Sequence, residues 1–512
     1  MRNIISFLLS ALLVFVFPSC KKQVLEVEPE GQESIEKLFT STDGAIQAIN
    51  AAYERFGMLG SGEAALFHYL EEKSDNAYHG RSNFEWDRYT ENSITAGIAE
   101  SWSSFFINIQ RANTVLGRLK NVPFKPAEIT NKLPESIEGQ AYFIRALSYF
   151  WLVQLWGDVP LYTTEIIDPQ SEAKARTKTL DVYNQIKSDL DLAIQKLPLK
   201  TQLNNSKGFE KFRASKGAAN ALKAEVHLVL GEWQAAADAA NAAIISNEFS
   251  LYSTANYIRN FQGLDENGIE SVFEIQYSAD NPAPLGILFN GQTNWHGYPG
   301  LVFGQARFGS PATDDLQTIP FVGVRGDGLS QAFEAGDIRK AVAISTYGNR
   351  PNPINSAGPS IWLCNKYYVS NLISERSNVN LPLIRYSKVL LTRAEALNEL
   401  GAANATATSI INNQIRSRAG LPALTTTVTD NQSSMRNAIL NERRVEFCFE
   451  VQRYFDLLRT GTLVNQIQVK QGVTVNPVRI TKHPITNKDI YLLPIPQNER
   501  DNNSKMTQNP GY

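Results

Sequence analysis

The sequence has few of the residues that build disulfide frameworks and metal centres. Its 512 residues include three cysteines and five histidines. Cys20 ends an apolar leader, so only Cys364 and Cys448 remain, too few for a disulfide framework. Cys448 falls in an apolar helical pattern, which predicts a buried free thiol. The histidines lack HExxH or comparable spacing, so we expect no metal site and no cofactor.

An excess of charge of one sign is also absent. Lysine and arginine number 49 and aspartate and glutamate 51, which gives a formal charge of −2 without a long run of either sign. A protein that neutralises many phosphates needs a concentrated basic face. The sequence therefore predicts that nucleic acid is not a partner.

Catalytic motifs are missing as well. Gly57–Glu63 (GMLGSGE) has glycines but no following Lys-Ser/Thr, so it is not a phosphate-binding loop. Arg325-Gly326-Asp327 is read as a tight turn. Glu71-Glu72 and Asp314-Asp315 are adjacent carboxylates, whereas glycoside hydrolysis needs two held on opposite sides of a bond. We assign no catalytic residue, although distant carboxylates that converge in space would leave a glycosidase open.

One long apolar run is present, at the start of the chain. Arg2 precedes the apolar stretch 4–17, and Ser19-Cys20 ends it. As a helix this stretch would measure roughly 21 Å, short of the roughly 30 Å hydrocarbon core, so it predicts a signal peptide over 1–19. A small residue before a lone cysteine is typical of a lipoprotein, so Cys20 is the predicted lipidation site and 20–33 the tether.

Beyond the tether the pattern is mostly helical. Apolar residues recur at three- and four-residue spacing in nine segments. These are 43–57, 101–120, 135–156, 179–196, 213–230, 233–246, 384–400, 404–418 and 434–459. We therefore predict a mainly α fold, in which a helical hairpin scaffold carries long irregular insertions and little β structure.

The stretch from Ala219 to Ile244 predicts a tetratricopeptide-like hairpin. Small residues at Ala224, Ala236 and Ala243, with Gly231 between the helices, suit two closely packed helices. Ala240 stands where such hairpins usually have a bulky residue, so a generic alanine-rich hairpin remains an alternative. A second hairpin is expected where Ala394, Leu397 and Gly401 take corresponding places.

The texture changes in the middle of the chain. Residues 270–277 alternate like a strand, and 278–360 are crowded with Gly, Pro and Asn. Such a long irregular insertion in a helical protein is more often functional than not. We divide the mature chain into an N-terminal helical region at 34–246, an irregular insertion at 247–380 and a C-terminal helical region at 381–512.

Several segments, in order, resemble the SusD/RagB family of Bacteroidetes-type bacteria. They are the lipobox at Cys20, the stretch at 139–161, the hairpin from Ser215 and the stretches at 382–401, 411–421, 441–461 and 492–499, with QNPGY at the end. The resemblance implies an outer-membrane, surface-exposed lipoprotein that works beside a SusC-like TonB-dependent transporter and is not an enzyme. In 442–459, acid and base alternate at helical spacing, which predicts ion pairs along one helix. We expect these residues, together with Arg145, Arg385 and Glu395, to determine the fold.

The resemblance also suggests where a ligand would bind. Family members commonly bind glycans through the segment after the first helical hairpin and through the long insertion, here 75–89 and 290–300. Both segments mix aromatic and polar residues, as a sugar with apolar faces and a rim of hydroxyls requires. The predicted ligand-binding residues are Asp75, Asn76, Arg81, Trp86, Trp295 and Tyr298.

Glycan binding is the leading hypothesis for the function, but three alternatives remain. Some family members capture peptides on the same scaffold, and nothing in these segments separates a glycan from a peptide. A structural tetratricopeptide adaptor and a surface glycosidase are the other two. For each tryptophan, packing of a loop onto the scaffold remains an alternative role.

Overall fold

A computed structural model of the chain describes most of the body. The described residues are 35–59, 66–79, 85–277, 322–324, 328–346, 362–367, 379–471 and 475–512. Several predicted features lie outside these ranges: the signal peptide, Cys20 and the tether, Arg81, Trp295, Tyr298, Asp314-Asp315 and Arg325–Asp327.

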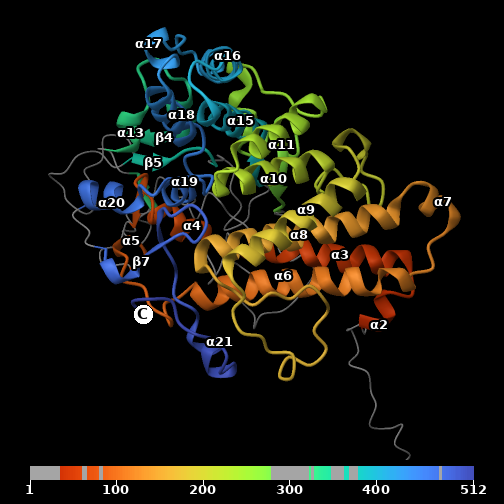
Figure 1. Cartoon of the computed structure of the whole chain (residues 1–512). Coiled ribbons are helices and arrows are strands. Elements are labelled where there is room, and N and C mark those ends of the chain that lie inside the picture. The colour runs from red at the N-terminus through yellow and green to blue at the C-terminus, as the bar shows by residue number, and fades with distance from the viewer. Residues whose placement is uncertain are drawn as a thin grey trace, which may run out of the picture.

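The first half of the scaffold is a stack of long helices. Each packs against the next in the order α3, α6, α8 and α9 (Figure 1). Their bounds are Thr42–Met58, Ile98–Arg118, Leu133–Trp156 and Thr179–Lys196. The 24-residue helix α8 is apolar on almost every side, because α6 covers one flank and α9 another. Arg145 of α8 pairs with Asp189 of α9 at 2.6 Å, so this predicted fold determinant is confirmed.

The stack continues through the second half of the chain. Helix α9 packs against α10, α10 against α11, α11 against α15 and α15 against α18. Their bounds are α10 Lys216–Leu230, α11 Trp233–Ile245, α15 Tyr386–Leu400 and α18 Gln432–Glu446. Because α11 and α15 are in contact, the insertion between them leaves the array unbroken (Figure 1). The predicted helical scaffold is confirmed.

The hairpin of α10 and α11 forms as its sequence predicts. The Ser215 hydroxyl accepts a hydrogen bond from the Ala218 N–H at 3.2 Å and caps α10. Gly231 ends the helix at φ +72°, a left-handed conformation that favours glycine. Ala224, Ala236, Ala240 and Ala243 are buried, so small side chains allow the close approach of the two helices.

The C-terminal motif differs from its prediction. The single helix expected over 434–459 is two helices, α18 and α19 (Arg453–Thr460), separated by a turn. In this turn Phe449 and Val451 adopt φ +63° and +61°, which is strained for a β-branched residue. Glu71 accepts a hydrogen bond from the Val451 N–H at 2.7 Å. The helix was over-predicted because contacts distant in sequence, and not a glycine or proline, stabilise the turn.

Within the described residues, short strands form three small antiparallel sheets. The predicted strand at 270–277 is confirmed as β2 (Ser271–Ile275), which pairs with β6 (Leu381–Arg385). The second sheet pairs β7 (Ile480–Lys482) with β8 (Asp489–Tyr491). The third has the order β1, β3, β5, β4, and we call it the insertion sheet. Its strands are Ala77–His79, Val322–Val324, Trp362–Cys364 and Ile344–Thr346.

The other described elements are short. They are α2 Ile35–Leu38, α4 Leu66–Glu72, α5 Glu85–Arg88, α7 Pro126–Thr130, α13 Leu329–Ala332, α14 Arg339–Ala343, α16 Ala405–Ser409, a π-helix Ile410–Arg416, α17 Thr426–Thr429, α20 Leu463–Gln471 and α21 Gln497–Asn502, with 3-10 turns at Leu119–Asn121, Lys200–Gln202, Thr254–Asn260 and Pro477–Arg479. Within the described ranges, no helix is long and apolar enough to cross a membrane. Cys364 and Cys448 are buried free thiols, which confirms the prediction for Cys448.

Candidate functional site

Strand β1 lies within the first segment predicted to bind ligand (75–89), and in the insertion sheet it pairs with β3, which follows the second segment (290–300) in the sequence. Strand β1 pairs with β3 in antiparallel register, with His79 opposite Val322 and Ala77 opposite Val324. The chain therefore leaves β1 toward Arg81 at the same end of the sheet at which it enters β3 after Trp295 and Tyr298. His79 and Val322, which are more than 200 residues apart in the sequence, therefore lie side by side.

A third part of the insertion is attached to the same sheet. Strand β4 pairs with β5, and Thr346 lies opposite Trp362, so the chain between them starts and finishes at neighbouring positions. Trp362 also pairs with Val324 of β3. Strands of this one sheet therefore border the stretches 80–84 and 278–321 on one side and 347–361 on both sides, and we take the sheet as the base of the candidate ligand site.

Asp75 and Asn76, at the entry to β1, are fully buried. The Asp75 carboxylate accepts two hydrogen bonds from the Arg453 guanidinium, at 2.6 and 2.9 Å, and lies 3.3 Å from Arg444. Arg444 also donates to the side-chain oxygen of Asn76 at 2.8 Å. The two predicted ligand residues instead join the segment after α4 to α18 and α19.

Trp86 of α5 is buried as well. Its ring stacks on Tyr69 of α4 with centroids 4.6 Å apart, and its N–H donates to the Ala96 carbonyl at 3.1 Å. A fully buried ring offers no face to a sugar, so the structure corrects the prediction for Trp86 as it does for Asp75 and Asn76. Of the predicted ligand residues, Arg81, Trp295 and Tyr298 lie outside the described ranges.

Lys73, which was not among the predicted site residues, is buried next to Trp86. The Lys73 ammonium lies 2.9 Å from Glu91 and stands over the rings of Tyr89 and Tyr491, 3.7 and 4.5 Å from their centroids. The Tyr491 hydroxyl donates to Glu91 at 2.6 Å. Burial lowers the pKa of Lys73, and the Glu91 carboxylate opposes that shift. The signal in the sequence is the unbroken polar run at 71–76, which is buried throughout.

The alternating charges of 442–459 differ from their predicted arrangement. Most of them are buried and pair with residues on other elements, not along one helix. Glu446 accepts hydrogen bonds from Arg385 at 2.8 Å and Arg418 at 2.6 Å. Burial disfavours its charged form, but these arginines outweigh burial and hold the pKa of Glu446 well below its usual range. The charged residues of 442–459 are confirmed as fold determinants, but the prediction that they pair along one helix was wrong.

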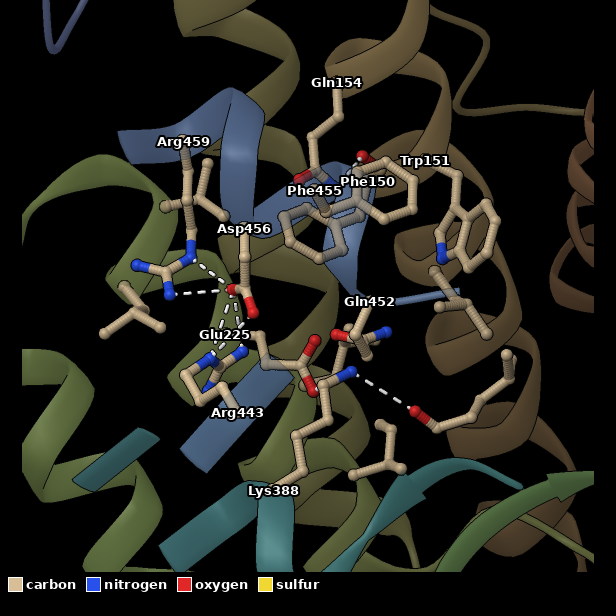
Figure 2. A pocket seen from close by; sticks show the side chains of 16 residues that line it. Phe150, Trp151, Gln154, Glu225, Lys388, Arg443, Gln452, Phe455, Asp456 and Arg459 are labelled. Carbon is tan, nitrogen blue, oxygen red and sulfur yellow. Dashed lines mark hydrogen bonds and ion pairs between the residues drawn. The ribbon is translucent and has the colours of Figure 1, made fainter. Parts of the chain in front are cut away.

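A small cavity lies between α8, α10, β6, α15 and α19 (Figure 2). Its volume is about 40 Å³, far below the roughly 300–1,000 Å³ of ligand pockets. Charged pairs line it: Lys388 with Glu225 at 2.7 Å, and Asp456 with Arg443 and Arg459 at 3.0 and 2.7 Å. These charges already have partners within the protein, and apolar side chains make up most of the remaining lining, so we do not take this small cavity as a ligand site.

No group of histidine, cysteine, aspartate or glutamate side chains in the described part of the chain could hold a metal ion. The described part of the candidate site is a small sheet whose flanking residues, Asp75 and Lys366 among them, belong to buried ion pairs.

Models of known families match both halves of the chain. The model described as "SusD family" matches residues 287–512, and the model described as "Starch-binding associating with outer membrane" matches residues 28–228. Between them they cover the scaffold helices apart from α11 and the last two residues of α10, together with all four strands of the insertion sheet. The chain belongs to the SusD/RagB family.

Curated relatives within the SusD/RagB family align along almost the whole chain. SusD-like protein P38 of Formosa agariphila is 27% identical over 503 residues, which covers 92% of this chain and 94% of that protein. SusD-like protein P2 of the same organism is 28% identical over 516 residues, with 95% and 96% covered. The starch-binding protein SusD of Bacteroides thetaiotaomicron is 24% identical over 426 residues, with 72% of each chain covered.

Solved structures share the SusD-like fold. A laminarin-binding SusD-like protein superposes with a TM-score of 0.73 at 24% identity, covering 93% of this chain and 100% of that chain. The surface glycan-binding protein A of Bacteroides fluxus gives a TM-score of 0.69 at 21% identity, with 92% and 100% covered. These superpositions confirm the helical, tetratricopeptide-like fold that the sequence predicted.

Proposed function

We propose that this SusD-family protein binds a glycan at the cell surface and passes it to a SusC-like TonB-dependent transporter without chemical change. The observation that supports the proposal is the pairing of β1 with β3, which places His79, just before the Arg81 segment, opposite Val322, where the stretch that includes Trp295 and Tyr298 ends. Relatives named for starch and laminarin binding support a glycan as the ligand class.

In this proposal the ligand residues are those of the insertions. Arg81 supplies hydrogen-bond donors to hydroxyl groups, and Trp295 and Tyr298 supply aromatic faces for the apolar sides of sugar rings. The buried residues around Asp75 have a supporting role, because they fix β1 and therefore the position from which the Arg81 segment departs.

Cys20 has a separate role. Several acyl chains on Cys20, each stabilised by about 0.8 kcal/mol per buried methylene, would hold the protein at the outer membrane. The tether at 20–33 would leave the helical body outside the bilayer, next to the transporter.

Trp295→Ala tests the proposed site. Loss of one stacking ring should weaken glycan binding about tenfold or more, since base stacking on an aromatic side chain, the nearest measured analogue, is worth roughly 1–3 kcal/mol. Titration calorimetry against a panel of starch, laminarin and other oligosaccharides measures the change, and chromatography of the recovered ligand tests for cleavage. The melting temperature should stay that of the parent protein.

Trp86→Ala is the matched control. Its ring is fully buried and stacked on Tyr69, so its removal should lower the free energy of unfolding by about 3–5 kcal/mol. If Trp295→Ala behaves in the same way, with a sharply lowered melting temperature and unchanged affinity, Trp295 belongs to the core and the proposed site is wrong.

A further inference from the structure

A large open cleft lies at the opposite end of the scaffold from the insertion sheet. Its volume is about 680 Å³, within the roughly 300–1,000 Å³ typical of ligand pockets. It is bounded by the turn from α7 into α8, by the end of α9 and by the loop that precedes α10. Figure 1 shows α7 at the far right, whereas α4, α5 and β5 lie on the left. We call it the α7 cleft.

Specific packing fixes the walls of the α7 cleft. Lys132 precedes α8 in a left-handed conformation at φ +59°. Gly208, at φ +85°, lies so close to α8 that an added Cβ would meet the Leu133 side chain at 2.5 Å. The loop is closed by a hydrogen bond from the Asn204 N–H to the Phe209 carbonyl at 3.0 Å. The cleft is therefore shaped by the fold, and is not a chance gap between loose loops.

The polar groups that line the α7 cleft suit a saccharide. Asn131, Gln195, Gln202 and Asn204 contribute amides, which both donate and accept hydrogen bonds. The side chains of Asn131 and Gln195 have no hydrogen-bond partner among the described residues. Phe209 is half-buried and adds an aromatic surface to the same lining.

The charge of the lining narrows the ligand class. The lining includes Lys132, Lys196 and Lys216 and no aspartate or glutamate. Lys196 pairs with Glu138 at 2.9 Å, outside the lining. Lys132 and Lys216 have no acidic partner within the described ranges, so two uncompensated positive charges face the same cleft.

We propose that the α7 cleft is a second saccharide-binding site, separate from the insertion sheet, and that it takes an acidic oligosaccharide bearing carboxylate or sulfate groups. The amides and Phe209 recognise the sugar rings, and Lys132 and Lys216 attract the anionic substituents. A protein with two such sites, one at each end of the scaffold, holds a long polysaccharide at two points.

The test uses tri-galacturonate as the acidic probe and the uncharged galactotriose as its counterpart. Calorimetry is run on the chain lacking residues 1–20, which keeps every described residue. We expect the double variant Lys132→Ala with Lys216→Ala to bind tri-galacturonate about three- to tenfold more weakly, since each exposed ion pair is worth roughly 0.2–1 kcal/mol. Added salt should weaken the binding of the unaltered protein. Lys120→Ala with Lys488→Ala, two exposed lysines outside the cleft, is the matched control.

Lysine acetylation followed by mass spectrometry locates the bound probe. Saturating tri-galacturonate should slow the acetylation of Lys132 and Lys216 and leave Lys120 and Lys488 unchanged. Unchanged rates at Lys132 and Lys216, equal affinity of the double variant and the unaltered protein, or tighter binding of galactotriose than of tri-galacturonate would each overturn the proposal. Trp295→Ala should preserve the protection of Lys132 and Lys216. The proposal for the α7 cleft and the proposal for the insertion sheet are therefore tested independently of each other.

Discussion

Glu71 shows how one buried carboxyl group supports a strained turn. It is almost fully buried at the end of α4, and it accepts a hydrogen bond from the N–H of Val451, whose φ is +61°. Burial raises the pKa of Glu71 to about 8, although the bond to Val451 and the charge of Lys366 oppose the shift. The folded protein therefore keeps this proton at pH values where the unfolded chain has lost it.

The stability contributed by Glu71 should fall as the pH rises. Below the unfolded pKa of 4.5 both states are protonated, and up to about 8 only the folded state is, so the free energy of unfolding declines across this window. Glu71→Gln keeps an acceptor for Val451 and removes the titration. We expect the variant to gain stability relative to the parent protein between about pH 5 and pH 8, by a few kcal/mol at about 1.4 kcal/mol per pKa unit.

Urea unfolding at a series of pH values measures this effect. Glu85→Gln, at an exposed position on α5, is the control and should follow the parent protein. Parallel stability curves for Glu71→Gln and the parent would show that the carboxyl group does not bind a proton on folding.

At the scale of elements, the segment from α4 into β1 is tied to helices that come almost 380 residues later. Asp75 accepts from Arg453 of α19, and Asn76 accepts from Arg444 of α18. These contacts set the place of β1, and β1 in turn sets the register of the insertion sheet. The C-terminal motif therefore acts on the candidate ligand site through the strand that it anchors.

Asp75→Ala should be strongly destabilising. It leaves the nearly buried Arg453 without its carboxylate partner, and breaking a buried ion pair in this way costs about 3–5 kcal/mol. Chemical denaturation measures the loss. Lys207→Ala removes an exposed pair with Asp43 and should change stability little. Equal stability of the two variants would contradict the anchoring role of Asp75.

In the molecule as a whole, the described helices form one array, whose buried apolar residues fall into one large cluster and two smaller ones, at the contacts of α10 and α11 with α15 and of α15 with α18. Alanines and glycines allow close approach within the α10 and α11 hairpin, and the contact of α11 with α15 carries the array past the insertion. The first described helix, α2, begins at Ile35, so the first 34 residues precede every described helix. We therefore expect that lipidation at Cys20 determines where the protein is located and is not required for folding.

Cys20→Ala tests whether the location of the protein depends on the lipid while its folding does not. We expect the variant to keep the circular dichroism spectrum and melting temperature of the parent, because acyl chains act on location and contact none of the described core. It should leave the outer-membrane fraction for the soluble fraction, measured by immunoblot in a strain that lacks the transporter partner. A variant that stays in the membrane fraction of that strain would contradict the lipid-anchor hypothesis.

Apolar periodicity and small residues act over neighbouring positions, so they predicted the helical scaffold, the β2 strand and the buried thiol of Cys448. The resemblance of several motifs indicated the family. Predictions from the sequence were wrong where a residue's contacts are with residues distant in the sequence. Trp86 and Asp75 look like ligand residues in a polar, aromatic segment, and only tertiary packing shows that Tyr69 and Arg453 cover them. The break before α19 was hidden for the same reason, because Glu71 stabilises it from the other end of the chain. Burial is a property of the assembled fold, and local composition does not encode it.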